Sequence, residues 1–393
     1  MREVYILAAG RTPLGGFGGQ LTTLSAPELG SIAIKSVLER CGLLDTGLIN
    51  EVLMGNVLSA NIGQAPARQA ALKAGLPFSV PCTTINKVCA SGMKAVMLGA
   101  QAIMSGQAEI VVAGGMESMS NAPFYLPGAR FGYKYGDGNL VDGLRKDGLH
   151  DVYNNFPMGN CAEKTASEMK ISREEQDQYA IKSYQRATKA WESGLFKREI
   201  CPVSISSKRN GSTIISEDED FKKVNYEKIS KLRSAFLPNG SVTAANSSNI
   251  SDGAAAMILA DKGTAESLEL PVIGKIAGFA DAANDPLWFT TAPALAIPKA
   301  LKNAGLEIGD IDFFEINEAF AAVAIANQQL LNIPDSKLNV YGGAVALGHP
   351  LGCSGSRIIT TLLSILHQEN GKLGVAGICN GGGGASAIVI EKI

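Results

Sequence analysis

The segment Ser91–Gly114, SGMKAVMLGAQAIMSGQAEIVVAG, has a counterpart 263 residues further along the chain, Ser354–Gly377, SGSRIITTLLSILHQENGKLGVAG. Both begin with Ser-Gly, continue through a stretch with helical character, and end in a short β-rich run that closes on Val-Ala-Gly. A second pair, Ser25-Ala26-Pro27 and Thr291-Ala292-Pro293, is 266 residues apart. This nearly constant spacing indicates a duplicated domain with two copies about a pseudo-twofold axis, the alternative being chance similarity between Ala- and Gly-rich segments.

Local signals in both copies predict alternating helices and strands. Ser25-x-x-Glu28 is a capping box that opens an amphipathic helix. The run Glu109–Ala113 is short and apolar and ends at two glycines, as a buried strand does. In the second copy we expect one helix and two strands, over Gly355–Asn370, Leu373–Cys379 and Ala385–Glu391. The alternation predicts an α/β fold of two duplicated domains, with mixed, mostly parallel sheets and helices outside them.

Between the two copies the sequence changes character. Residues 121–160 are rich in Gly, Pro, Tyr and Asn, Ser172-x-x-Glu175 caps a long amphipathic helix that ends near Gly194, and Lys222–Lys231 is basic. The stretch is too long for a plain loop, so we interpret it as an inserted subdomain that binds substrate. The predicted organisation is an N-terminal domain of residues 1–120 with 250–270, an inserted loop subdomain of residues 121–249, and a C-terminal domain of residues 271–393.

The composition of the 393 residues excludes several functional classes. With 35 Lys+Arg against 37 Asp+Glu, the chain lacks the basic surface that nucleic acid requires, and its 46% apolar content excludes a disordered chain. Because only 18% of the residues are charged, we expect part of the surface to be buried between subunits. No apolar run approaches the roughly 20 residues of a membrane span, and the N-terminus resembles neither a secretory signal nor a transit peptide. The seven cysteines are scattered without a CxxC pair, which favours a reducing compartment, so we expect a cytoplasmic protein.

Cys89 is the first candidate for catalysis. It lies in Asn86–Gly92, NKVCASG, directly before an expected helix. The positive end of a helix dipole and its free N–H groups favour the thiolate, so we expect a pKa below the usual value of about 8.5. A small buried cysteine at a helix start is the structural alternative.

Of the three histidines, only His349 has the surroundings of a displayed side chain. Gly348 leaves room around its ring, and Pro350 biases it away from helix. His367 lies near a helix end, where a cation suits the dipole, and His150 is expected to be exposed. His349 is therefore the candidate.

Cys379 precedes a run of four glycines, Gly381–Gly384, that follows an expected strand. Such a run indicates a backbone that approaches a ligand closely, and its N–H groups suit an oxyanion hole. A phosphate loop is the rival interpretation, but no Gly-Lys-Ser/Thr follows. Asn317-Glu318 lies where a β-rich run meets a helix, so Asn317 is either a polar site residue or a helix cap.

Together these pieces resemble the thiolase family. The resemblance spans essentially the whole chain and rests on four motifs in family order: the Cys89 segment, Asn317–Phe320 (NEAF), Gly342–Pro350 ending in GHP, and Cys379-Asn380-Gly381. The segments Val88–Lys94 and Thr243–Asn246 are most similar to the short-chain biosynthetic type, and to its eukaryotic members. The resemblance implies acetyl-CoA C-acetyltransferase activity, which condenses two acetyl-CoA to acetoacetyl-CoA and CoA and runs in reverse as thiolysis, and which supplies the mevalonate pathway of sterol and isoprenoid synthesis.

The resemblance also implies a ping-pong mechanism. Cys89, activated by His349, would take the acetyl group, and Cys379 would then remove a proton from the methyl carbon of a second acetyl-CoA. His349 and a water held by Asn317 would stabilise the enolate, and the N–H groups of Cys89 and Gly381 would hold the tetrahedral oxyanion. The chemistry itself requires no cofactor.

Binding positions and assembly follow from the same resemblance. The CoA contacts that it implies are Tyr184, Lys223, Lys228 and Ser248, and Met158 would shorten the acyl pocket. It further implies a potassium site formed by Tyr184, Ala244, Ala245, Ser247 and Val345. Ser247 departs from the alanine expected there, and the site is retained if the ligand is the backbone carbonyl. Leu287–Thr290 departs from bacterial and mitochondrial patterns, which leaves tolerance of branched acyl groups open. The expected assembly is a homotetramer, a dimer of dimers.

Two other functions compete with this one. A degradative 3-ketoacyl-CoA thiolase for longer chains is disfavoured by Met158 and by the lack of an organelle address. A non-catalytic thiolase-like acyl or lipid carrier is disfavoured because Cys89, Asn317, His349 and Cys379 are all present. A ketoacyl synthase of the same fold would lack the second thiol.

Overall fold

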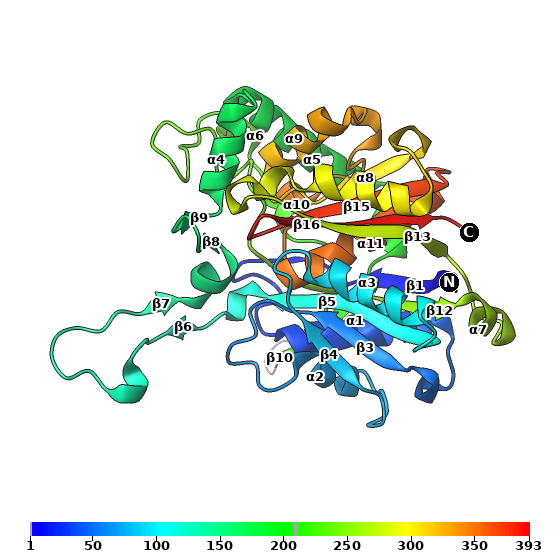
Figure 1. Cartoon of the computed structure of the whole chain (residues 1–393). Coiled ribbons are helices and arrows are strands. Elements are labelled where there is room, and N and C mark those ends of the chain that lie inside the picture. Colours follow the sequence, from blue (N-terminus) through cyan, green and yellow to red (C-terminus); the bar gives the residue numbers. More distant parts are fainter. Residues whose placement is uncertain (1, 208–210) are drawn as a thin grey trace.

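The body of the protein is one large sheet whose two halves follow the same plan (Figure 1). The computed structural model describes residues 2–207 and 211–393. The N-terminal half has the strand order β4-β3-β5-β12-β1, and the C-terminal half continues as β13-β16-β15-β14. The strands are β1 Val4–Arg11, β3 Glu51–Gly55, β4 Cys82–Ile85, β5 Ile110–Ser118, β12 Ser251–Asp261, β13 Gly274–Ala283, β14 Phe313–Ile316, β15 Leu373–Asn380 and β16 Gly384–Glu391, with the short β2 Gly15–Gly16 beside β12.

Each half pairs its strands in the same senses. β4, β3 and β5 are parallel, and β12 and β1 then follow antiparallel. In the second half β14 and β15 are parallel, and β16 and β13 follow antiparallel. The halves meet where Val4–Ile6 of β1 pairs with Gly274–Ile276 of β13. The repeat confirms the duplicated α/β fold that the constant sequence offset predicts.

The balance of strand senses differs from the prediction. Among the strand pairs described in this sheet, three are parallel and six are antiparallel, so the sheet is mixed but not mostly parallel. After β15 only Gly381–Gly383 precedes β16, and such a short link forms a hairpin, because a parallel return requires a crossover of about a dozen residues. Gly382 (φ 85°) and Gly383 (φ 86°) provide the left-handed turn.

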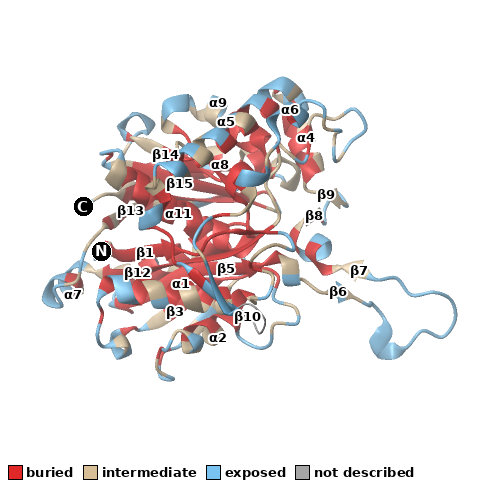
Figure 2. Ribbon diagram, turned by 180° about the vertical axis from the view of Figure 1, so that it is seen from behind, coloured by how far each residue is buried: buried red, intermediate tan, exposed pale blue. Residues whose placement is uncertain are grey.

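Two central helices lie between the halves, and others cover the outer faces (Figures 1 and 2). α3, Ser91–Met104, and α11, Leu351–Gln368, pack against each other and against β5. α1 Ala26–Cys41 and α2 Pro66–Lys73 cover the N-terminal half, and α8 Pro293–Ala304 covers the C-terminal half. All residues of α11 as far as Leu366 are buried, so this helix forms the centre of the molecule.

Two elements extend beyond their predicted bounds. α11 begins at Leu351 rather than Gly355, because Pro350 occupies the N-cap position and the helix starts directly after it. β5 does not end at Gly114-Gly115 but continues to Ser118. A Cβ at Gly115 would overlap the carbonyl oxygen of Gly352, so the glycine permits close packing of α11 rather than ending the strand.

The two central helices meet at a reciprocal glycine contact. A Cβ on Gly92 of α3 would lie 2.8 Å from Oγ of Ser356, and a Cβ on Gly355 of α11 would overlap the backbone nitrogen of Met93. Gly92 and Gly355 occupy equivalent places in the two copies. The contact therefore has the symmetry expected of a pseudo-twofold axis.

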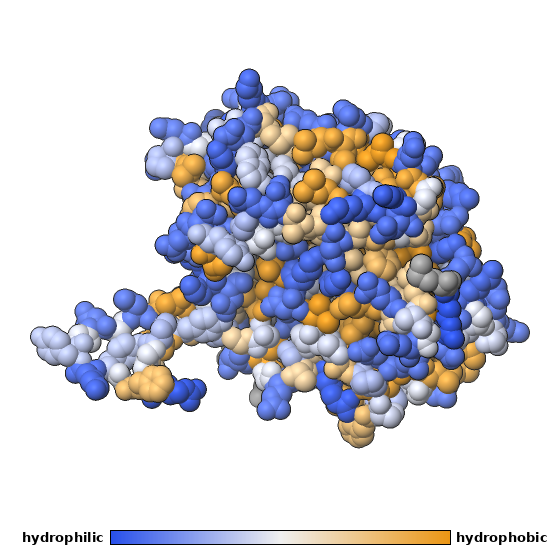
Figure 3. All heavy atoms as spheres, viewed as in Figure 1, coloured by the Kyte–Doolittle hydropathy of each residue, from blue (hydrophilic) through white to orange (hydrophobic). Residues whose placement is uncertain are grey.

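The region between the copies forms helices over the C-terminal half and a projecting arm (Figure 1). α5 opens at the Ser172/Glu175 capping box, as predicted, and packs on α9 and α10. The arm, residues 121–143, extends away from the body and stands clear of it in Figure 3 as well. The remaining elements are α4 Gly159–Glu168, α5 Arg173–Glu192, α6 Tyr226–Ile229, α7 Lys262–Ser267, α9 Ala321–Leu331, α10 Ala344–Leu347, β6 Phe124–Tyr125, β7 Val141–Asp142, β8 His150–Asp151, β9 Phe156–Pro157, β10 Val203–Ser207 and β11 Gly211–Ile215. None of the described helices combines the length and apolar character that crossing a membrane requires.

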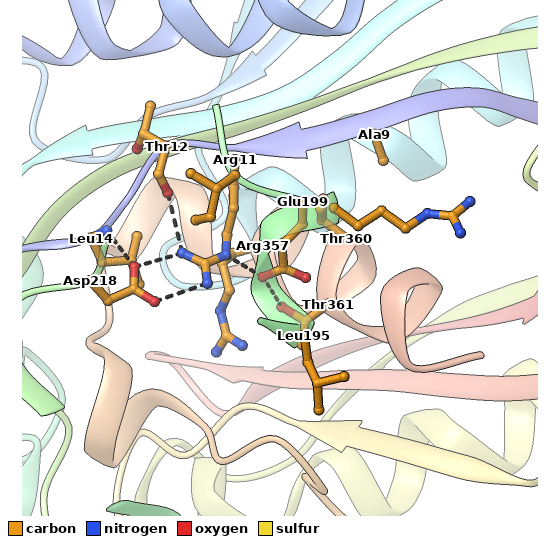
Figure 4. A network of polar contacts seen from close by, with 12 residues as sticks. Ala9, Arg11, Thr12, Leu14, Leu195, Glu199, Asp218, Arg357, Thr360 and Thr361 are labelled. Atoms are coloured by element: carbon orange, nitrogen blue, oxygen red, sulfur yellow. Dashed lines mark hydrogen bonds and ion pairs between the residues drawn. The ribbon is translucent and has the colours of Figure 1, made fainter. Parts of the chain in front are cut away.

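A buried ion network ties the inserted region to the sheet (Figure 4). Arg11, at the end of β1, donates to Glu199 Oε1 (2.5 Å) and to both carboxylate oxygens of Asp218 (2.7 and 2.9 Å). All three side chains are fully buried. Because breaking a buried pair leaves an uncompensated charge, this network holds the inserted residues firmly on β1.

Candidate active site

Cys89 lies on a tight turn between β4 and α3. Val88, directly before it, has φ 48°, a left-handed conformation that β-branched residues rarely adopt. Asn86 Oδ1 accepts the N–H of Val88 (3.0 Å), while Ser91 Oγ accepts the N–H of Lys87 (2.8 Å) and donates to the Val88 carbonyl (2.6 Å). Strain of this kind persists where surrounding contacts over-determine it, commonly at functional sites. The turn presents the Cys89 thiol at the start of α3.

His349 comes from the other half, at the entrance to α11. Its N–H donates to the carbonyl of Asn249 (3.0 Å). Its ring Nδ1 lies 2.6 Å from Ser354 Oγ, which itself donates to the carbonyl of Pro350 (2.9 Å). Because the Ser354 proton is used there, Nδ1 carries the ring proton and Nε2 keeps its lone pair. Burial lowers the pKa of His349 to about 3, so the ring is a neutral base.

Asn317 and Cys379 lie at the ends of two neighbouring strands of the C-terminal half, β14 and β15. Asn317 comes directly after β14, and its Nδ2 lies 3.5 Å from His349 Nε2. Its Oδ1 is buried without a partner among the described residues, so it can accept a hydrogen bond from water or substrate. α9 begins only at Ala321, so Asn317 is not a helix cap. Cys379 is fully buried, and both this burial and the neighbouring Cys89 raise the pKa of its thiol.

Gly381 brings a backbone donor to the nucleophile. Its N–H and that of Cys89 itself both donate toward the Cys89 sulfur. A Cβ at Gly381 would touch Val88 Cγ1 and Met158 Cε, both at 3.6 Å, so the loop after β15 closes over the Cys89 turn. Cys379 belongs to an apolar cluster that also contains Phe156, Met158, Phe236, Leu287, Phe289, Ala319 and Phe320. Two thiols, a neutral imidazole, a free amide oxygen and two N–H donors thus meet in a largely dry pocket.

Comparison with known proteins identifies this arrangement. The model of the thiolase N-terminal domain matches residues 4–263, and that of the thiolase C-terminal domain matches residues 270–392. The chain belongs to the thiolase family. Acetyl-CoA acetyltransferase 2 of Arabidopsis thaliana is 58% identical over 100% of this thiolase and 98% of its own length. Acetyl-CoA acetyltransferase of Saccharomyces cerevisiae is 53% identical over 100% of both chains.

A solved structure agrees with this assignment. The Acat5 thiolase from Ascaris suum in complex with coenzyme A superposes with a TM-score of 0.94 at 47% identity, and the match covers 100% of both chains. The predicted family, the α/β thiolase fold and the class of acyl-transferring enzyme are therefore confirmed.

The titration of Cys89 in this thiolase differs from the prediction. Burial raises the pKa of the Cys89 thiol to about 11, and it outweighs the N–H groups of Gly381 and Cys89, which lower it. The prediction of a depressed pKa was wrong because it counted the helix N-terminus and left out the cost of desolvating the thiolate. The Cys89 thiol and the His349 ring are therefore both neutral near pH 7.

A cavity of about 670 Å³ gathers most of the predicted binding residues. Its walls include Tyr184, Lys223, Lys228, Ala244, Ala245, Ser247 and Ser248. Asn249 also lines it and accepts the N–H of His349, which places the inner end of the cavity beside the catalytic group. Two predicted residues do not line the cavity: Met158 packs in the apolar cluster that contains Cys379, and the carbonyl of Val345 accepts from Nδ2 of the wall residue Asn249 (3.3 Å).

The two cavity lysines differ in their partners. Lys223 is paired with Glu219 (2.6 Å) and Asp220 (2.9 Å), so much of its charge is already neutralised. Lys228 makes no ion pair with any described residue. Of the two, Lys228 is the better placed to meet a phosphate.

The predicted potassium ligands suit an alkali ion by their chemistry. Tyr184, Ala244, Ala245 and Ser247 line the cavity together, and a phenol with backbone carbonyls offers the oxygen ligands that hard cations take. The Ser247 hydroxyl donates its proton to the carbonyl of Thr243 (2.6 Å), which leaves the lone pairs of its own oxygen and of the Ser247 carbonyl able to coordinate an ion. The departure from alanine at position 247 is thus compatible with the site.

Sequence reasoning missed two buried partners of the site. Ser354, one turn into α11, sets the tautomer of His349. Glu318, beside Asn317, accepts hydrogen bonds from Tyr179 Oη (2.9 Å) and the N–H of Val345 (3.0 Å), and so fixes the strand end that carries Asn317. The five-residue spacing from His349 to Ser354 across Pro350 was the available signal for Ser354.

Proposed function

We propose that this thiolase is an acetyl-CoA C-acetyltransferase, which joins two acetyl-CoA to acetoacetyl-CoA and CoA and catalyses the reverse thiolysis. The observation that carries the proposal is the pair of neighbouring buried thiols, Cys89 and Cys379, beside the neutral ring of His349. One thiol suffices to carry an acyl group, whereas carbon–carbon bond formation also requires a base for the donor carbon. The relatives named acetyl-CoA acetyltransferase support the same reaction.

The first half-reaction transfers the acetyl group to Cys89. His349 Nε2 takes the thiol proton as Cys89 Sγ attacks the thioester carbonyl, and the N–H groups of Gly381 and Cys89 stabilise the oxyanion. The bond to the CoA sulfur then breaks, and Cys379 protonates the leaving thiolate. Acetyl-Cys89, protonated His349 and the Cys379 thiolate remain.

The second half-reaction forms the carbon–carbon bond. The Cys379 thiolate, a strong base because burial raises its pKa, removes a proton from the methyl carbon of a second acetyl-CoA. Protonated His349 and a water on Asn317 Oδ1 stabilise the enolate oxygen. The enolate carbon attacks acetyl-Cys89, and the departing Cys89 sulfur takes its proton back from His349. All three groups return to their starting protonation states.

The substrate class follows from the cavity and the pocket beside it. The volume of the cavity, about 670 Å³, lies in the range of cofactor sites, and we assign Lys228 to the CoA phosphates and Tyr184 and Ser248 to the wall along the chain. Met158 and its aromatic neighbours fill the space around Cys379, which favours acetyl and acetoacetyl groups over longer chains. A degradative role for long-chain 3-ketoacyl-CoA would need this apolar cluster to open. A non-catalytic carrier would have no use for the second buried thiol.

The surroundings of the enzyme are proposed on the same basis. We assign a potassium ion to Tyr184 and the carbonyls of Ala244, Ala245, Ser247 and Val345, where it would order the cavity wall. Phe131 and Tyr135 on the arm are 87% and 104% exposed, and such apolar tips on a projecting arm favour a homotetramer in which arms clasp neighbouring subunits.

Compartment and domain roles complete the proposal. All seven cysteines are free, which favours a reducing compartment, and we propose the cytoplasm and the supply of mevalonate synthesis. One relative, from Xenopus tropicalis, is named as mitochondrial, so localisation of the tagged protein is the direct test. We assign residues 121–249 to CoA binding and the two flanking domains to the nucleophile and to its partners.

The deciding experiment compares thiolysis of acetoacetyl-CoA, its 2-methyl derivative and a long-chain 3-ketoacyl-CoA, each with and without potassium. We expect kcat/KM to be highest for acetoacetyl-CoA and to rise with potassium. Preference for the long chain would overturn the substrate assignment, and the absence of any turnover would favour the carrier.

A further inference from the structure

Glu117 is a buried carboxylate held entirely by N–H donors. Its Oε1 accepts from Asn56 Nδ2 (2.8 Å) and the Leu58 N–H (3.1 Å), and its Oε2 accepts from the N–H groups of Val57 (3.0 Å) and Gly352 (2.8 Å). The side chain is fully buried, and no described basic side chain pairs with it. Four directed donors therefore take the place of a counter-ion.

The carboxylate lies where the two catalytic turns meet. Gly352 is the second residue of α11, and its carbonyl approaches Gly55 of β3, where a Cβ would lie 2.7 Å from it. The same Cβ would lie 2.5 Å from the backbone nitrogen of Gly92, at the start of α3. The N-termini of both central helices thus converge on β3 and β5 beside Glu117. A carboxylate at a helix N-terminus is favoured by the helix dipole as well as by the free N–H groups.

Each side of Glu117 leads to one catalytic residue. On one side Gly352 follows His349 by three residues, within the turn that Ser354 ties to the imidazole ring. On the other side Asn56, whose amide donates to Glu117, also donates its backbone N–H to the carbonyl of Ile85 (3.0 Å). Ile85 is the last residue of β4, directly before the turn that carries Cys89.

Burial and donors act on Glu117 in opposite senses. Burial raises the pKa of Glu117 to about 7. The N–H groups of Gly352, Leu58 and Val57 oppose this shift and so favour the ionised carboxylate near neutral pH. A neutral amide in its place would turn one acceptor oxygen into an NH₂ group facing the donors. The contacts at Glu117 therefore require a carboxylate, not merely a side chain of this size.

We propose that Glu117 is a positioning residue for acyl transfer: its carboxylate fixes the start of α11, and with it His349, against the strand end that leads to Cys89. The proposal rests on the proposed function, because it assigns Glu117 a role in proton transfer from Cys89 to His349. Glu117 touches neither substrate nor reacting atoms.

The test compares Glu117→Gln with Asp312→Asn. Asp312 is a matched control, because its carboxylate also accepts two backbone N–H groups, those of Lys372 (2.7 Å) and Leu373 (3.0 Å), but at the far end of β15. We expect Glu117→Gln to lower kcat about 100-fold with KM for acetoacetyl-CoA unchanged, the scale of an error of about 1 Å in placing a catalytic group. Asp312→Asn should retain kcat, and its loss of Tm should be smaller because Asp312 is only partly buried. Equal kcat in both variants would overturn the positioning role.

A second measurement separates this proposal from the proposed function. Iodoacetamide alkylation of Cys89, followed by peptide mass spectrometry with half-buried Cys82 as internal reference, reports how far His349 assists the thiol without any thioester. Glu117→Gln should slow alkylation of Cys89 relative to Cys82, even if the wild type were to prefer another acyl chain. An unchanged ratio of the Cys89 and Cys82 alkylation rates would overturn the proposal. Should Glu117→Gln not fold, Asn56→Ala removes a single donor and should slow the same reaction to a smaller extent.

Discussion

Replacing Ser354 by alanine tests how the catalytic base is held. Ser354 Oγ accepts a hydrogen bond from His349 Nδ1 (2.6 Å) and donates one to the carbonyl of Pro350. Alanine removes both contacts without changing the backbone of α11. The ring proton is then left without a partner in a pocket where His349 is only 5% exposed, so water cannot easily replace the hydroxyl.

The magnitude follows from that burial. Leaving a buried donor unsatisfied costs about 1–3 kcal/mol. The ring can relieve this cost by changing tautomer or by rotating. The conformation that presents Nε2 to Cys89 is then less stable than these alternatives by the same free energy. At about 1.4 kcal/mol per factor of ten, Ser354→Ala should lower kcat for thiolysis by about 5- to 150-fold. KM should change little, because Ser354 does not line the CoA cavity.

The matched control is Ser356→Ala, two residues further along the same buried helix. Ser356 Oγ donates to the carbonyl of Cys353 (2.8 Å) and does not contact His349. Steady-state thiolysis of acetoacetyl-CoA and the rate of acetyl transfer to Cys89 should both fall in Ser354→Ala and hold in Ser356→Ala. Equal rates in the two variants would refute the tautomer assignment.

Further outcomes test the rest of the site. Cys379→Ser should still become acetylated on Cys89, detected by mass spectrometry of the labelled peptide, but lose condensation; a fully active variant would remove Cys379 from the role of base. The amount of Cys89 thiolate, measured as the ultraviolet absorbance that is lost in Cys89→Ala, should rise about tenfold per pH unit from pH 6 to 9, because burial raises its pKa to about 11; a plateau near pH 7 would contradict this value. Gly355→Ala should destabilise the fold by about 1–3 kcal/mol in urea titrations, since its Cβ would overlap backbone; native stability would show that α3 and α11 can separate there. Phe131→Asp with Tyr135→Asp on the arm should shift a tetramer to dimers in light scattering while Tm is retained, and an unchanged mass would exclude the arm from assembly.

The fold was predictable where the sequence repeats itself. The offset between Ser91–Gly114 and Ser354–Gly377 indicated two α/β copies, and the strand orders of the two halves confirm it. The strand senses were not predictable from alternation alone, because the hairpin after β15 depends on three glycines whose first interpretation was ligand binding. Likewise Gly115 resembled a strand end, whereas its real partner is a helix more than 200 residues away.

The candidate site was predictable in its residues but not in its electrostatics. Cys89, His349 and Cys379 stood out because reactive side chains close to glycines are unusual, and the structure buries all three, with Cys89 near Cys379 and His349 near Asn317. The pKa of Cys89 could not be predicted, since the desolvation that raises it depends on tertiary packing that the local sequence does not show. Glu117 carries no local signal, because its role depends on a tertiary contact with the start of α11, whereas the signal for Ser354 was only its five-residue spacing from His349.

The reciprocal contact of Gly92 and Gly355 has a consequence for how the two copies diverge. Each glycine leaves the space that the other helix occupies, so a larger residue in one copy must be accommodated by a change in the other. After the duplication the copies were free to specialise, one keeping the nucleophile and the other its proton-transfer partners. At this helix crossing, however, a substitution in one copy is tolerated only with a compensating change in the other, so the two positions are expected to vary together.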